Sequence, residues 1–182
     1  MKTLRSLAVA VLALTPAFAA DEGSPSPSPA SDQNERAEKP ISGPEFARKA
    51  AGSGLAEVAM GRLGTEKGSA PSIRAFGEKM VSDHNGANKE LVEIAGRKDI
   101  DLPDELPAKY RRTADKIEKL EGAAFDRAFA QAMVESHEEA VVLFRRAAAQ
   151  CTDEDLKGFA IKTLPTLEGH LTEARALKAG LD

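Results

Sequence analysis

The chain of 182 residues is short of the residue types that usually fill or cross-link a compact fold. It has no tryptophan, one tyrosine, seven phenylalanines and a single cysteine, Cys151. One cysteine cannot form an intramolecular disulfide, so a disulfide-linked fold is excluded. We expect Cys151 to be an unpaired thiol in a loop, with an intermolecular disulfide as the alternative. Because aromatics are scarce, the core must consist of Leu, Ala, Ile, Val, Met and a few Phe, which favours helices.

The first 19 residues have the features of a secretory signal peptide. Lys2 and Arg5 precede an apolar run, 7–14, and Ala17 and Ala19 form a small-x-small cleavage pattern. The apolar run is shorter than the roughly 20 residues of a membrane span, which argues against an uncleaved anchor. No cysteine follows the cleavage site, so a lipid anchor is not expected. The sequence therefore predicts a bacterial periplasmic or secreted protein with no transmembrane span after cleavage.

The segment 20–43 is rich in Ser, Pro and charge and offers almost nothing to bury. Ser-Pro occurs three times between Ser24 and Pro29, and we expect a disordered, solvated tether. Removal of Lys2 and Arg5 leaves 23 basic residues against 29 acidic ones, a net charge of −6 with neutral histidines. That balance argues against nucleic acid as a partner. An envelope protein partner stays open, as does the oligomeric state, although a monomer or weak association is expected.

Residues 44–180 show helical periodicity, and no strand pattern of useful length appears in the chain. The spacing of apolar residues and the positions of Pro and Gly predict four long helices and a short crossover helix. A two-residue break between the first two helices indicates an antiparallel hairpin. Pro165 lies inside the last helix, where we expect a local kink. The predicted helices run from 44 to 68, from 71 to the break at 99–106, from 107 to 121, from 123 to 150, and from a cap at Thr152 or Asp153 onward.

Three histidines are all that the chain contains, and each lies near the middle of a different predicted helix, on or beside its apolar stripe. They are His84, His137 and His170, and Glu57 occupies a similar position in the first helix. Counted along the helices at 1.5 Å per residue, the four come within one or two turns of the same height. Neighbouring helices in a bundle lie 8–10 Å apart, so these side chains could converge on the bundle axis.

Three neutral imidazoles and a carboxylate suit a transition metal such as Zn, Fe, Mn or Cu. The sequence thus predicts a metal site at Glu57, His84, His137 and His170. Such a site needs neighbours that orient each ring, and the candidates are Asp83, Asn88, Glu138 and Glu173. The alternative is a buried hydrogen-bonded network, in which the histidines pair with Asp83, Glu57 or backbone groups and only fix the packing of the helices.

Other site chemistries have little support in this sequence. The di-iron signature of ferritin-like bundles places Glu three residues before His on two helices. Here those positions hold Val81, Val134 and Leu167, which argues against a carboxylate-bridged ferroxidase centre. Nucleophilic catalysis is not indicated either, because Cys151 lies at a helix end and no Gly-x-Ser-x-Gly elbow is present. No Gly-rich phosphate-binding loop is present. The catalytic residues, if any exist, stay unknown.

Four motifs occur along the chain in a fixed order: Asp83-His84, Phe125-Asp126, His137-Glu138, and Leu164-Pro165 with His170. In these motifs and their spacing the chain resembles the DUF4142 family of exported bacterial proteins, which belongs to the ferritin-like superfamily. The resemblance covers about residues 45 to 177 and implies an all-α, ferritin-like four-helix bundle in the cell envelope. It implies no established activity.

Three functions follow from these observations. The first is an exported bundle that binds a transition metal through the histidines, for metal handling or stress protection. The second is a non-enzymatic envelope interaction or structural protein displayed on its tether, which needs no metal. The third is a redox or peroxide-handling enzyme, which would require an open coordination position beside the last helix.

Overall fold

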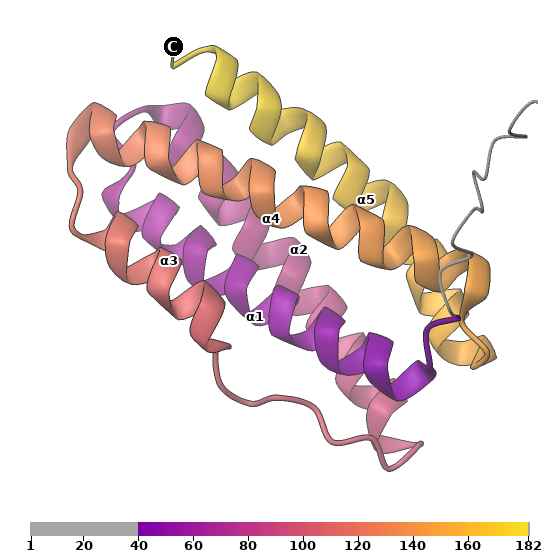
Figure 1. The fold of residues 1–182 in the computed structure, drawn as a ribbon. Helices are drawn as coiled ribbons and strands as arrows, with labels where there is room; N and C mark the ends of the chain where they lie inside the picture. The colour runs from indigo at the N-terminus through magenta and orange to yellow at the C-terminus, as the bar shows by residue number, and fades with distance from the viewer. Residues whose placement is uncertain (1–39, 182) are drawn as a thin grey trace, which may run out of the picture. The chain divides into compact units, whose positions relative to one another are not determined.

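A computed structural model describes residues 40–181, and the predicted signal peptide and most of the predicted tether lie outside this range. Within it the chain forms five helices and no strand, as expected (Figure 1). Ile41 is fully buried, so packing begins two residues before the predicted end of the tether. The helices are α1 (Gly43–Lys67), α2 (Pro71–Gly96), α3 (Ala108–Glu118), α4 (Gly122–Gln150) and α5 (Glu154–Ala179).

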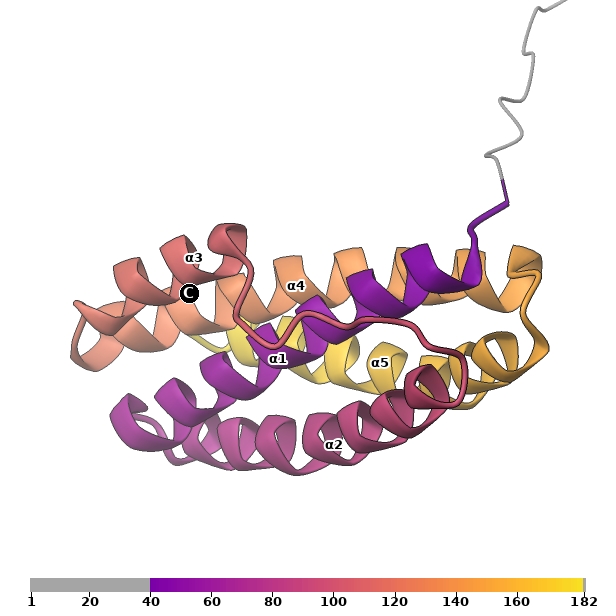
Figure 2. The ribbon, with the colours of Figure 1, turned by 90° about the horizontal axis from the view of Figure 1, so that it is seen from below.

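The four long helices form a closed ring in the order α1, α2, α5, α4, and each is antiparallel to both neighbours (Figures 1 and 2). The side chains that meet across α2 and α5 show this register, since Lys79 contacts Glu173 and Glu90 contacts Lys162. α2 and α4 therefore run in the same direction, and the chain must return along the bundle between them. Residues 97–107 and the short α3 make that return across α1 (Figure 2). One long crossover is the connectivity of ferritin-like bundles.

The helix starts follow from capping chemistry. The Ser42 hydroxyl accepts the backbone N–H of Glu45 at 3.3 Å, and a proline lies in the first turn of α1. At the start of α5 a carboxylate oxygen of Asp153 accepts the N–H of Leu156 at 3.1 Å, which selects Asp153 over Thr152 as the cap. α5 runs on through Pro165 as one continuous helix.

Two glycines allow α1 and α2 to approach closely. A Cβ atom on Gly77 would lie 2.6 Å from the carbonyl oxygen of Gly61, and one on Gly61 would lie 2.8 Å from that of Gly77. The backbones therefore touch at this point. Glu57 lies one turn before Gly61 and His84 two turns after Gly77, so the glycine contact holds these two side chains within reach of each other.

The turn between α1 and α2 is held by a carboxylate from α4. Asp126 is buried, and its two oxygens accept the backbone N–H groups of Ser69 at 2.8 Å and Ala70 at 2.9 Å. The Phe125-Asp126 motif thus joins the start of α4 to the start of α2.

Two aromatic clusters lie on either side of the bundle's middle. At one end the ring of Phe46 packs edge-on against Phe144 at 5.1 Å between centroids, and at the other Phe125 stacks on Phe129 at 5.9 Å. The three histidines lie between these clusters. Cys151 lies in the connection from α4 to α5, and at 3 % exposure it offers little surface to a second thiol. Within the described range no helix is long and apolar enough to cross a membrane.

Candidate metal centre

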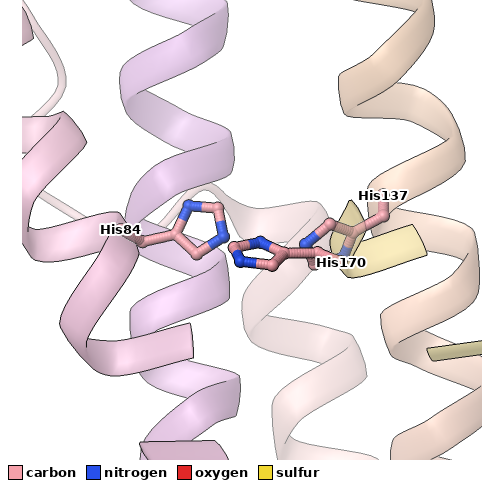
Figure 3. Close-up of side chains that lie close together, drawn as sticks. All are labelled: His84, His137 and His170. Carbon is pink, nitrogen blue, oxygen red and sulfur yellow. The ribbon is translucent and has the colours of Figure 1, made fainter. Parts of the chain in front are cut away.

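The structure brings the three histidines together at the middle of the bundle, from α2, α4 and α5 (Figure 3). One ring nitrogen from each of His84, His137 and His170 lies within 4.8 Å of the other two. The ring centroids are 5.3 to 5.6 Å apart, which makes a nearly equilateral triangle. All three side chains are buried, at 5 %, 0 % and 1 % exposure.

Each imidazole uses one nitrogen to contact a protein group. Nδ1 of His137 donates to the carbonyl oxygen of Met133 at 2.9 Å, because a carbonyl only accepts. Nε2 of His170 lies 2.9 Å from Oδ2 of Asp83, and Nδ1 of His84 lies 3.0 Å from Oε2 of Glu57. An ionised carboxylate accepts an N–H from the ring, so Asp83 places the proton of His170 on Nε2. Glu57 places the proton of His84 on Nδ1 in the same way once it is ionised.

The second nitrogen of each ring has no hydrogen-bond partner among the described residues. These are Nε2 of His84, Nε2 of His137 and Nδ1 of His170, and each is fully shielded from solvent. With Glu57 ionised and the opposite ring nitrogens protonated, all three present lone pairs to the interior. Three buried acceptors without a donor are costly to leave unsatisfied, whereas a cation among them would satisfy all three.

The spacing of these rings fits one ion after a small adjustment. Metal–nitrogen bonds of about 2.0–2.1 Å place the nitrogens of a tetrahedral site about 3.3 Å apart. Small rotations of the rings would therefore close the triangle around an ion. The hydrogen-bonded network that we set against a metal site accounts for only one nitrogen of each ring.

Glu57 lies beside the histidine cluster rather than at the middle of the triangle. Oε2 contacts the far nitrogen of His84, and Oε1 accepts the hydroxyl of Ser136 at 3.1 Å and lies 3.9 Å from Nε2 of His137. The carboxyl group therefore contacts one ring and faces the open nitrogen of another. Its predicted role as a metal ligand stays a prediction, and in this structure it orients His84.

Burial controls the protonation of the cluster. It raises the pKa of Glu57 to about 8, and the nearby hydroxyls of Ser136 and Ser53 act in the opposite direction. It lowers the pKa of His84 to about 3, helped by repulsion from the other two histidines, and that of His137 to about 4. The pKa of His170 is also lowered by burial, against the opposing effect of Asp83. Neutral imidazoles are the form that binds metals.

Of the four predicted orienting residues, the structure places one against a histidine. Asp83 contacts His170, as described above. Asn88 lies near Gly54 and lines a small cavity with Glu57 and His84. The carboxylate of Glu138 binds Arg175 at 2.7 Å, and that of Glu173 binds Lys79 at 2.9 Å, both on the surface.

Sequence reasoning missed two groups that hold the site, the hydroxyl of Ser136 and the backbone carbonyl of Met133. Ser136 directly precedes His137, and a hydroxyl next to a buried histidine was the available signal. The carbonyl of Met133 leaves no trace in a side-chain pattern.

A small cavity adjoins the cluster and is lined by residues of all four long helices. Its volume is about 20 Å³, and its polar lining consists of Ser53, Glu57, His84, Asn88 and Thr163. That volume is enough for one water molecule.

Comparisons with known proteins agree with this architecture. The family model described as "Domain of unknown function (DUF4142)" matches residues 26–177, so the chain belongs to this family. A solved structure of a DUF305 fragment from Deinococcus radiodurans is similar in fold, with a TM-score of 0.65 and 12 % sequence identity. The match covers 76 % of this chain and 94 % of that one, which at such identity shows the fold alone. No curated protein matches the chain significantly.

Proposed function

We propose that this member of the DUF4142 family binds one transition-metal ion through His84, His137 and His170, in the bacterial cell envelope. The observation that carries the proposal is the set of three buried ring nitrogens that lack a partner. Neutral imidazole is a ligand for Zn, Cu, Fe and Mn, and carboxylate contacts to the far nitrogens are typical of metal-binding histidines. The signal-like first 19 residues support export.

The electrostatics of the cluster also support a cation. Glu57 and Asp83 each contact a proposed ligand histidine through the ring nitrogen that does not face the metal. A carboxylate at that nitrogen makes the other nitrogen a stronger ligand for a metal. A cation at the centre in turn favours the ionised form of Glu57, whose charge is otherwise costly to bury. The two groups therefore stabilise each other.

Three protein nitrogens leave a coordination position for a water or another small ligand. An ion with such an open position supplies Lewis-acid or, for Fe, Mn or Cu, redox chemistry. The role that we propose is metal handling or protection against stress.

The test begins with the metal content of the mature chain, residues 20–182, made without a polyhistidine tag. We expect close to one ion per chain by mass spectrometry, and a higher melting temperature with metal than with chelator. An ion at 100 times its Kd stabilises the folded chain by about 2.7 kcal/mol. Substoichiometric metal together with an unchanged melting curve would contradict the proposal and favour the structural or interaction protein.

Single variants then assign the ligands. H84Q, H137Q and H170Q should each weaken binding by more than the roughly 10- to 100-fold that loss of an orienting partner costs. E138Q is the matched control, because Glu138 adjoins His137 in sequence but binds Arg175 on the surface. Equal affinity in all four variants would exclude the histidine cluster as the site.

A further inference from the structure

We propose that Asp83 is the entry point through which metal ions reach the histidine cluster, along the contact between α2 and α5. This inference rests on the proposed metal site. It addresses a question that burial raises, because an ion must leave water and reach three side chains that are almost fully enclosed. A buried metal site needs such a path.

Asp83 links the cluster to solvent. Among the described residues, the polar groups that contact the histidines are the carbonyl of Met133, Glu57 at 2 % exposure, and Asp83, whose side chain is 36 % exposed. Asp83 alone of these three is both open to solvent and in contact with a proposed ligand, through Nε2 of His170. A carboxylate is also a ligand in its own right for all the metals considered.

The contact between α2 and α5 is polar on both sides of Asp83. Lys79, one turn earlier, binds Glu173 at 2.9 Å, and Lys162 binds Glu90 at 2.8 Å two turns later. Lys79 is thereby directed to a carboxylate on α5 rather than held on Asp83. Surface ion pairs of this kind are weak, so they can separate and re-form at little cost.

The other approach to the cluster, beneath α3, does not suit a hydrated cation. A groove of about 510 Å³ lies there. Its lining carries three positive side chains, Arg48, Lys49 and Lys109, against one negative side chain, Glu139, which binds Lys109. Ser53 lines both this groove and the inner cavity beside Glu57. That cavity holds about 20 Å³, which admits a water but not an ion with its hydration shell.

Asp83 thus has two separable roles, to orient His170 and to attract and transfer the ion. D83N distinguishes them, because the amide oxygen still accepts the N–H of His170 while the charge is lost. If Asp83 is the entry point, metal uptake and release should both become slower, by at least about tenfold for uptake, with a much smaller change in Kd. D83E should keep rates close to those of the unmodified chain.

The measurement is stopped-flow uptake of Co²⁺, followed by its absorbance, with release measured after addition of a chelator. E138Q removes one nearby negative charge that faces away from the cluster, and its rates should be unchanged. Unchanged rates in D83N would overturn the proposal. Faster release with unchanged uptake would reduce Asp83 to an orienting residue and overturn it as well. If the unmodified chain binds neither Co²⁺ nor any other metal tested, the proposed metal site itself is overturned.

Discussion

Glu57 on α1 and His84 on α2 are in contact at 3.0 Å, and both side chains are almost fully buried. Burial moves their pKa values in opposite directions, up to about 8 for the acid and down to about 3 for the base. Each group is thereby driven toward its neutral form in the metal-free protein. The pair therefore lowers the free energy of unfolding both above and below an optimum pH.

The first prediction is that the metal-free protein is most stable near pH 6.5. Glu57 stays protonated when folded but ionises near 4.5 when unfolded, so its contribution is lost as pH rises from 4.5 through 8. His84 and His137 have lowered folded-state pKa values, so their contribution is present above 6.5 and is lost as pH falls toward 4 and 3. The lowered pKa of His170 acts in the same direction, so the histidines together make the free energy of unfolding rise up to about pH 6.5. Glu57 makes it fall at higher pH.

The Glu57 branch is tested by urea unfolding in chelator between pH 6.5 and 8. The unmodified chain should lose up to about 1.4 kcal/mol per pH unit there, and E57Q should lose little or none. E78Q on the exposed face of α2 is the control and should follow the unmodified chain. A flat profile in the unmodified chain would show that Glu57 is already ionised when folded.

The second prediction concerns Asp126. D126A should destabilise the fold by about 1 to 3 kcal/mol, because the N–H groups of Ser69 and Ala70 lose their acceptor. The free energy of unfolding from a denaturant titration measures this. D104A, in the exposed connection before α3, is the control and should change it by less than about 0.5 kcal/mol. Equal values for the two variants would mean that the turn does not depend on the α4 carboxylate.

The third prediction compares two glycines of α2. At Gly77 a Cβ would meet backbone atoms of α1, including the N of Thr65 at 2.6 Å, so G77A should cost about 1 to 3 kcal/mol or more. At Gly86 a Cβ meets nothing within 4 Å, and G86A should stabilise by about 0.5 to 1 kcal/mol through better helix propensity. Thermal melts of the two variants should therefore shift in opposite directions. A shift of G77A in the same direction as G86A would contradict the close contact.

Much of the fold follows from local sequence signals. The predicted helix limits came from Pro44, Gly68, Pro71 and a cap at Thr152 or Asp153. The structure places the helix ends within one residue of Pro44, Gly68, Pro71 and Asp153. Periodicity also placed the three histidines and Glu57 on the inner faces of their helices. These predictions succeed because capping and amphipathic burial are properties of a few consecutive residues.

The partners of the histidines did not follow from sequence, for a geometric reason. Asp83 and Glu138 both adjoin a histidine, so both lie about 100° from it around their helices. Whether such a residue contacts the histidine cluster depends on which neighbouring helix packs against its side of the helix. Asp83 lies toward His170 on α5, whereas Glu138 lies toward Arg175 at the surface. Pairings of this kind are set by the angles between helices, which no single segment determines.

Burial of the lone thiol gives the molecule an internal reporter. Cys151 is 3 % exposed and lies in the connection between α4 and α5. An alkylating reagent therefore reaches it only when this connection opens locally. Its labelling rate thus reports the opening of the bundle without any added probe, and a ligand that joins α4 to α5 would slow that rate.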